Sequence, residues 1–358
     1  MKIAFVVFSL RGGGAERVVS ELSNQLSGEM DISIIQLSDI KPFYQLDSRI
    51  ERRSFGGPQN GFLRYIRLAR YLYLALRAVR PDVAVSFGET ISPFVIAVAR
   101  LARVPIIASN RASPLLSLRG RRKWLNPIAF RFANAVLVQT ERAIEILGKP
   151  FRGCRWIIME NPVPVPKFVP PDSSRENICV SVGFLGGQKN QMAVIRAFVK
   201  SAPADWSLII VGDGPDRQML VEFADDLGLA ARIHFTGAVK SVYSILQRAR
   251  VFAFASRSEG FPNALAEAMA FGCACISYDC VTGPRELIEH GESGLLIDLD
   301  DEQAFADGMK SLMKDSVLRG KLSVGARKRA SELCVNRVAE RFIGSISEVL
   351  ASDSVRPR

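Results

Sequence analysis

The chain has 358 residues, of which 48% are hydrophobic and 23% charged, a composition typical of a globular protein with about two domains. No apolar run approaches the ~20 residues that a membrane-spanning helix needs, and no small-residue cleavage site follows residues 1–10, so we expect a cytoplasmic protein. Two histidines and six cysteines without C-x-x-C spacing argue against a zinc site. The net charge of +11 belongs to the first half, where residues 1–165 carry 24 Lys and Arg against 12 Asp and Glu, which predicts an anionic partner there.

Short apolar runs alternate along the chain with longer amphipathic segments. This alternation predicts parallel sheets with helices on both faces. The predicted strands are residues 3–9, 32–37, 83–87, 105–109, 136–139 and 156–159, then 178–183, 207–211, 232–236, 251–255, 274–278 and 295–297. Predicted helices include residues 15–26, 63–79, 191–200, 217–227 and 335–350.

A proline-rich stretch at residues 161–171 separates the two series of strands. The predicted fold class is therefore α/β, with two doubly wound Rossmann-like domains that face a central cleft. We assign residues 1–163 to the first domain and 164–334 to the second. Ligands are expected at the carboxyl ends of the strands in such domains.

Residues 11–17, Arg-Gly-Gly-Gly-Ala-Glu-Arg, follow the first predicted strand and open a helix. Gly13 and Gly14 would let backbone amides approach a phosphate at the helix N-terminus. A plain strand-to-helix turn explains these glycines equally well.

Residues 62–80 predict an amphipathic helix with a basic outer side. Its cations are Arg64, Arg67, Arg70, Arg77 and Arg80, and residues 120–124 add Arg121, Arg122, Lys123 and Trp124. Such a surface suits an anionic membrane leaflet, and an ordinary surface helix is the alternative. Because no nucleic-acid-binding motif accompanies the charge, nucleic acid is not an expected partner.

The second domain repeats the glycine-rich junctions between strand and helix. Gly187 and Lys189 lie within residues 182–190, where a lysine is placed to neutralise a diphosphate. Gly212 opens the turn Gly-Asp-Gly-Pro after the next predicted strand, which a simple turn also explains.

Residues 256–270, Ser-Arg-Ser-Glu-Gly-Phe-Pro-Asn-Ala-Leu-Ala-Glu-Ala-Met-Ala, carry the most informative pattern of the chain. Glu259 lies in the loop before a predicted helix, where free backbone amides attract anions. Glu267 lies within the helix among apolar neighbours, where a carboxylate is costly unless it has a partner. Two carboxylates so placed could hold a sugar ring and a ribose with phosphates between them. The alternative is a surface loop followed by a packed helix.

This segment resembles the E-x7-E signature of retaining glycosyltransferases of the GT-B fold, in particular family 4. The segments 182–190, 211–217, 235–237, 283–288 and 291–296 also resemble that family's second domain, and 11–17 resembles its "GGAER"-like loop. The resemblance implies that Glu259 contacts hydroxyls of the donor sugar and Glu267 the ribose. It also implies that a helix within residues 335–358 returns to the first domain.

On this basis we assign two sets of site residues. The catalytic set is Glu259, Lys189, Arg111 and Asn110, and the donor-binding set is Gly13, Gly14, Gly187, Gly212, Gly260, Phe261, Pro262, Asn263 and Glu267. No metal ligand is assigned, because no Asp-x-Asp lies in a plausible diphosphate site, and we expect metal-independent activity without a cofactor.

Two positions depart from the family pattern. Phe184 stands where an Arg usually grips the diphosphate beside Lys189, and Arg257 or Arg11 could compensate. Residues 1–165 contain no His, although many family members place one after the strand at 105–109. Residues 108–114 resemble instead a "SERNDP" variant, which places Asn110 and Arg111 towards the cleft. A structural loop with a solvated Arg is the alternative.

The predicted function is transfer of a hexose or N-acetylhexosamine, with retention, from a nucleotide sugar expected to be UDP-linked. The expected acceptor is a glycan on polyprenyl diphosphate at the inner face of the cytoplasmic membrane, in surface polysaccharide or glycan biosynthesis. A nucleotide-sugar epimerase remains an alternative. So does a catalytically inactive homologue that scaffolds a membrane assembly, because of Phe184 and the missing His.

Overall fold

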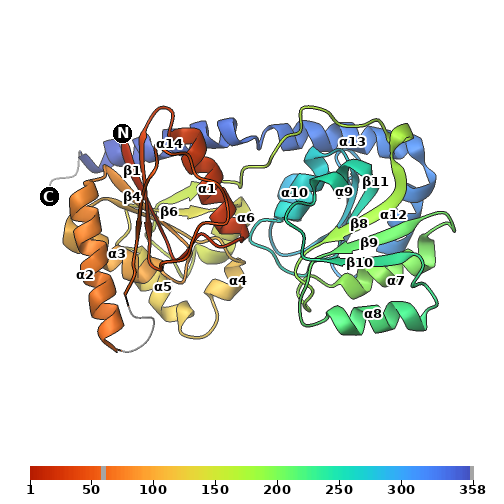
Figure 1. The fold of residues 1–358 in the computed structure, drawn as a ribbon, viewed down its shortest axis with the longest axis horizontal. Helices are drawn as coiled ribbons and strands as arrows, with labels where there is room; N and C mark the ends of the chain where they lie inside the picture. Colours follow the sequence, from red (N-terminus) through yellow and green to blue (C-terminus); the bar gives the residue numbers. More distant parts are fainter. Residues whose placement is uncertain (58–61, 355–358) are drawn as a thin grey trace. The chain divides into compact units, whose positions relative to one another are not determined.

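The computed structural model describes residues 1–57 and 62–354, which form two compact units (Figure 1). Unit 1 comprises Met1–Pro162 and Val335–Arg358, and unit 2 comprises Val163–Cys334. None of the described helices is long and apolar enough to cross a membrane.

Unit 1 is built on a parallel sheet, in which the described strands number seven, with the order β3-β2-β1-β4-β5-β6-β7. The strands are β1 (Lys2–Val7), β2 (Asp31–Gln36), β3 (Glu51–Ser54), β4 (Val83–Phe87), β5 (Ile106–Ser109), β6 (Ala135–Val138) and β7 (Trp156–Ile158). The helices are α1 (Gly14–Leu26), α2 (Phe62–Val79), α3 (Ser92–Ala102), α4 (Pro114–Ser117), α5 (Arg122–Phe130), α6 (Glu141–Leu147) and α14 (Val335–Ser354).

Apolar stripes at helical spacing decide which helix covers which face of this sheet. Helices α2, α3 and α5 cover one face, where they bury Leu72, Val95 and Phe130 in the core. On the other face α1 packs beside α14, whose Phe342 ring stacks on Phe5 of β1 with a centroid distance of 6.0 Å. The last helix of the chain therefore completes the core of unit 1.

Unit 2 repeats the plan on a parallel sheet, in which the described strands number six, with the order β10-β9-β8-β11-β12-β13. The strands are β8 (Glu176–Val182), β9 (Ser207–Val211), β10 (Ile233–Gly237), β11 (Ala249–Phe254), β12 (Ala274–Asp279) and β13 (Leu295–Asp298). The helices are α7 (Gln191–Ser201), α8 (Arg217–Asp226), α9 (Tyr243–Arg248), α10 (Asn263–Ala270), α11 (Pro284–Leu287), α12 (Glu302–Lys314) and α13 (Ser316–Ser331), preceded by the 3-10 turn η1 (Asp172–Ser174).

The α/β fold class with two doubly wound series is confirmed. Each predicted strand is present with its ends within two residues of the prediction. The prediction was wrong in omitting β3, whose sequence is Glu-Arg-Arg-Ser. Among the described strands this edge strand pairs with β2 alone. Its charged side chains disfavour pairing at the open edge, so it shows none of the apolar alternation that identifies a strand.

Each sheet reverses its strand order once, and this reversal positions the sites described below. The reversal lies between β1 and β4 in unit 1 and between β8 and β11 in unit 2. Loops that leave neighbouring strands at such a point turn to opposite faces of the sheet and leave a crevice at the carboxyl ends.

Candidate functional site

The loops that follow β8 and β11 are tied together at the reversal point of unit 2. The main-chain oxygen of Gln188 accepts a hydrogen bond from the Arg257 amide at 2.9 Å, and its side-chain amide donates to the Ser258 main-chain oxygen. These contacts fix residues 183–190 against residues 255–262. Two side chains far apart in the sequence are thereby held together.

Those two side chains are Lys189 and Glu259. The Lys189 Nζ lies 2.6 Å from the Glu259 Oε1 and 5.3 Å from the centre of the Phe254 ring. The Glu259 side chain is only 9% exposed and that of Lys189 24%. The main-chain oxygen of Glu259 accepts a hydrogen bond from the Thr282 hydroxyl, which joins the loop after β12 to the site. A cation and a carboxylate thus meet at the carboxyl ends of adjacent strands.

Helix α10 carries the remaining predicted residues of this segment. Glu267 lies within the helix and is buried, in agreement with its apolar neighbours in the sequence. Phe261 is buried, Pro262 is the N-cap and Asn263 the first helical residue, while Gly260 is half-buried between them and Glu259. The sequence prediction that one carboxylate precedes the helix and the other lies within it is confirmed.

Glycines let the neighbouring loops approach this site closely. A Cβ at Gly212, where φ is +140°, would lie 1.8 Å from the Gly183 main-chain oxygen. Gly187 is different, because a Cβ there would meet no atom within 4 Å. Gly212 is therefore needed for packing, whereas Gly187 leaves its backbone open to a ligand.

We expect Gly212→Ala to lower the free energy of unfolding by about 2 kcal/mol or more, because the new Cβ meets a backbone oxygen and the φ is unfavourable. Gly187→Ala is the matched control and should unfold at the wild-type denaturant concentration. Urea titration followed by circular dichroism measures both. Equal midpoints for the two variants would contradict the proposed packing role of Gly212.

Position 184, where the family pattern has an arginine, carries a phenylalanine in this chain. Phe184 is 63% exposed and supplies no charge. Arg257, one candidate to replace that arginine, instead forms an ion pair with Asp300 at 3.0 Å. Lys189 is thus the cation paired with Glu259 among the described contacts. The described residues also contain no group of three or more His, Cys, Asp or Glu placed to hold a metal ion.

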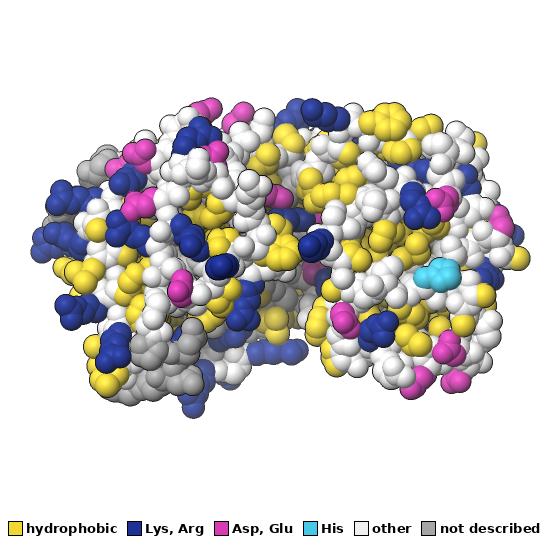
Figure 2. Space-filling model, in the orientation of Figure 1, with side chains coloured by type: hydrophobic (Ala, Val, Ile, Leu, Met, Phe, Trp, Pro, Cys, Tyr) yellow, Lys and Arg dark blue, Asp and Glu magenta, His cyan; other side chains and the backbone are white. Residues whose placement is uncertain are grey.

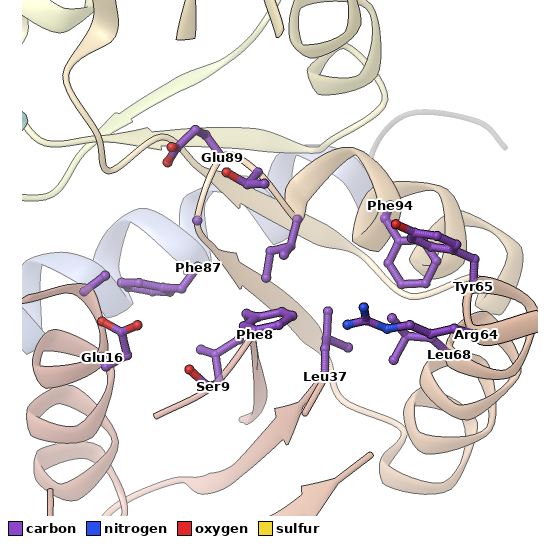
Figure 3. Close-up of a pocket in the computed structure, with 15 residues that line it drawn as sticks. Phe8, Ser9, Glu16, Leu37, Arg64, Tyr65, Leu68, Phe87, Glu89 and Phe94 are labelled. Carbon is purple, nitrogen blue, oxygen red and sulfur yellow. The ribbon is translucent and has the colours of Figure 1, made fainter. Parts of the chain in front are cut away.

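Unit 1 has a pocket of about 630 Å³ at its own reversal point, where β1, β2 and β4 end (Figure 3). Its lining is largely apolar and includes Phe8 and Phe87 from the strand ends and Phe94 from α3. Glu16 of α1 and Glu89 contribute carboxylates on one side. Phe8 was not among the predicted site residues. An aromatic residue directly after a buried strand is the sequence feature that could have identified it.

The glycine loop of unit 1 lies beside this pocket. Gly14 begins α1 and Gly13 is its N-cap. A Cβ at Gly13 would lie 2.3 Å from the Glu16 Oε2, so the helix's own carboxylate already lies over its N-terminal amides. A phosphate at these two glycines would have to displace Glu16.

Asn110 and Arg111 are both buried inside unit 1. The Asn110 amide donates to the Ser117 hydroxyl at 2.8 Å. The Arg111 guanidinium donates to the Met159 main-chain oxygen at 3.3 Å and to the Asn161 side chain. Burial lowers the pKa of Arg111, and the side chain is 9% exposed, so the alternative of a solvated Arg is wrong. Arg111 anchors the chain where β7 leads towards unit 2.

The predicted basic helix is present as α2, with one correction. Arg67 and Arg70 are exposed, but Arg64 is half-buried and lines the pocket, because it lies one helical turn before the buried Leu68 on the same side of α2. Arg121 is exposed, and the Arg122 NH1 lies 3.6 Å from Glu89 at the pocket. Of these five cations, Arg67, Arg70 and Arg121 are therefore exposed, whereas Arg64 and Arg122 are half-buried at the pocket.

Comparison with known families and proteins identifies the family of the chain. Residues 12–165 match the family described as Glycosyltransferase Family 4, and residues 167–329 match Glycosyl transferases group 1. The chain is 28% identical, over 98% of its length and 99% of the relative's, to a Campylobacter jejuni alpha-1,4-N-acetyl-D-galactosaminyltransferase whose name specifies a diNAcBac-PP-undecaprenol-linked glycan. It is 26% identical to the amylovoran biosynthesis glycosyltransferase AmsD of Erwinia amylovora, over 89% of this chain and 92% of that protein.

Solved structures support the same fold. HepE from Anabaena in complex with UDP superposes with a TM-score of 0.81 at 18% identity, covering 97% of this chain and all of the other. The complex of HepE with UDP and glucose gives a TM-score of 0.82, over 97% of this chain and 99% of that one, at 19% identity. The two family matches together span most of the described chain, and the chain is therefore a GT-B glycosyltransferase of the family 4 type.

Proposed function

We propose that this enzyme transfers a hexose or N-acetylhexosamine from a UDP-sugar, with retention at the anomeric carbon, to a glycan carried on polyprenyl diphosphate. The observation that carries the proposal is the Lys189–Glu259 pair at the reversal point of unit 2. The names of the relatives support the lipid-linked acceptor, and the UDP complexes of structural neighbours support the nucleotide.

The donor would bind at the carboxyl ends of β8 and β11. Lys189 and the open backbone at Gly187 would take the diphosphate, since a cation and free amides favour negative charge. Glu259, released from part of its contact with Lys189, would accept hydrogen bonds from the sugar hydroxyls. Glu267 would bind the ribose.

In this proposal the transfer step keeps the configuration of the anomeric carbon. The bond between the anomeric carbon and the leaving phosphate oxygen breaks, and the acceptor oxygen bonds to the same carbon from the same face. The acceptor proton passes to the leaving phosphate. Negative charge grows on the diphosphate during this step, and Lys189 stabilises it. These positive groups would allow transfer without a metal.

The pocket of unit 1 has the chemistry of a site for acceptor sugars. Phe8 is 44% exposed and offers an aromatic face to an apolar ring side, and Glu16 and Glu89 can accept hydrogen bonds from hydroxyls. The exposed Arg67, Arg70 and Arg121 would contact anionic lipid, and the enzyme would then act peripherally at the inner face of the cytoplasmic membrane.

The test is a panel of UDP-sugars, each mixed with the full chain and a polyprenyl-diphosphate-linked glycan, with and without EDTA. We expect one donor to yield an α-linked product by mass spectrometry and NMR, with UDP released only when acceptor is present and EDTA without effect. Interconversion of the donor without acceptor would instead indicate an epimerase. UDP binding without turnover would indicate an inactive homologue, and a β-linked product would overturn retention.

A further inference from the structure

A cavity of about 270 Å³ lies at the amino ends of three neighbouring strands of unit 2. Its lining includes Arg175, which directly precedes β8, Arg250 in β11 and Ala274 at the start of β12. Residues of α13 and of the turn after α10 complete the wall. The Lys189–Glu259 pair lies at the carboxyl ends of the same sheet, so this cavity is separate from the proposed donor site.

The described lining of the cavity carries four guanidinium groups against one carboxylate, which leaves a net charge of +3. The charged residues are Arg175, Arg250, Arg319, Arg327 and Asp172. Unit 2 as a whole is not basic, because residues 163–334 carry 19 Lys and Arg against 21 Asp and Glu. On the face of unit 2 that Figure 2 shows, Lys and Arg side chains lie among Asp and Glu. The excess of positive charge therefore belongs to the cavity, where it attracts an anion.

The carboxylate of the cavity is already engaged. Arg319 forms a bidentate pair with Asp172, in which its Nε lies 3.0 Å from Oδ1 and its NH2 lies 2.7 Å from Oδ2. The Arg250 Nε lies 3.9 Å from the same Oδ1. Because Asp172 is taken by these two arginines, it leaves the charges of Arg175 and Arg327 unpaired among the described contacts.

Arg175 is a buried cation with an unused donor. It is only 6% exposed and forms no ion pair among the described contacts. Its Nε and NH1 donate three hydrogen bonds to main-chain oxygens, and its NH2 donates one to that of Phe271 at 2.6 Å. A guanidinium has five N–H donors, so one N–H of NH2 has no described acceptor. This NH2 would lie 3.2 Å from a Cβ at Gly272, which also lines the cavity. A buried charge without a counter-ion is costly, and an anion in the cavity would offset that cost.

The α13 side of the cavity is open to a ligand. Arg327 is exposed and has no hydrogen bond or ion pair among the described contacts. Gly320 lies two helical turns before it, and a Cβ there would meet no atom within 4 Å. Sites for drug-sized ligands begin at about 300 Å³, so this smaller cavity suits a small anion better than a nucleotide.

We propose that this cavity binds inorganic phosphate, as orthophosphate or as diphosphate. Guanidinium forks match phosphate oxygens, and a phosphate group carries about −1.5 to −2 at pH 7, which offsets more of the positive charge than one carboxylate would. Arg175 would donate its unused N–H, and Arg327 would close the site from α13. The anion would thereby join α13 to the end of α10, where Arg175 holds the Phe271 oxygen, and would stabilise unit 2.

Isothermal titration of the full chain with orthophosphate, and separately with diphosphate, tests the site. We expect saturable binding of at least one of the two, and the tighter of them identifies the ligand. The urea midpoint should rise in that anion relative to sodium chloride of equal ionic strength, because a ligand that binds only the folded state stabilises it. Both measurements need neither donor nor acceptor, so they do not depend on the proposed transfer activity.

Variants assign the binding to this cavity. Arg327→Ala should weaken it about tenfold or more, the usual cost of one charge-assisted contact. Gly320→Glu should weaken it about 100-fold or more, because the new carboxylate occupies the open space and repels a phosphate. Gly320→Gln adds the same bulk without the charge and should weaken it less.

Matched controls separate the cavity from the rest of the chain. Lys328→Ala removes an exposed cation at the next position of α13, outside the described lining of the cavity, and should bind like the wild type. Lys189→Met/Glu259→Gln removes both charges of the proposed donor site and should also bind like the wild type. Urea midpoints without phosphate should be the same for Arg327→Ala, Lys328→Ala and the wild type, which shows that the fold is intact.

Three results would overturn the proposal. One is no saturable binding of either anion by the wild type. Another is wild-type affinity in both Arg327→Ala and Gly320→Glu. The third is loss of binding in Lys189→Met/Glu259→Gln, which would assign the anion to the donor site instead.

Discussion

Glu259→Ala is expected to lower kcat/KM for sugar transfer by about 10²–10³-fold, the usual cost of losing a polar group that acts in the transition state. The Glu259 side chain is 9% exposed, so water does not readily take its place in the variant. Among the described contacts, no second carboxylate is paired with Lys189 that could take over its role. Initial rates with the productive UDP-sugar measure the loss. UDP affinity should change much less, because the proposed contact is with the sugar.

Two further variants isolate the cause. Glu259→Gln keeps the shape and one acceptor oxygen, and its rate should lie between those of the wild type and Glu259→Ala. Glu222→Ala removes an exposed carboxylate of α8 whose described contact is with Gln218, and it should transfer at the wild-type rate. If Glu259→Ala keeps its kcat/KM within about threefold of wild type, the role of this residue in the donor site is refuted.

Local patterns were enough to predict the fold and part of the site. The positions of Glu259 before α10 and of Glu267 within it follow from the sequence, because an apolar run, Pro262 and Gly272 define that helix. Gly272 does adopt a positive φ of +73° just after the helix. Such signals lie within a few residues of one another, where helix and turn chemistry acts directly.

The contacts that build the site were not predictable in this way. Lys189 and Glu259 are 70 residues apart, and they meet only because β8 and β11 are neighbours in the sheet. Arg111 reaches Asn161 across a similar gap in sequence. Its burial could not be anticipated from a polar loop segment that gave no apolar signal. Strand order, which no single segment encodes, decides these contacts.

The exposed apolar side of α5 was missed for a different reason. Periodicity identifies an amphipathic helix but not which of its sides faces the sheet. Leu125, Ile128 and Phe132 would ordinarily be assigned to a core. In the structure Phe130 fills that place, and the other three stay outside. A sequence pattern therefore predicts that a helix has an apolar side, but not whether that side packs on the sheet or faces solvent.

Lys189→Met is expected to separate the structural and functional roles of this residue. It leaves the Glu259 carboxylate buried without its cation, and breaking such a pair costs about 3 kcal/mol of unfolding free energy. The double variant Lys189→Met/Glu259→Gln removes both charges, so most of that stability should return. Urea denaturation of the two single variants, the double variant and the wild type gives the coupling energy.

Donor binding should not return with the stability. Without Lys189 the diphosphate loses a charge-assisted contact worth about 1.5–3 kcal/mol, and UDP affinity should fall about 10- to 150-fold in both Lys189→Met and the double variant. Lys189→Arg keeps the positive charge and should bind UDP within about tenfold of wild type, since charge rather than shape dominates at a diphosphate. Isothermal titration measures all three. If the stable double variant binds UDP like the wild type, Lys189 only neutralises Glu259, and the diphosphate must bind to other groups.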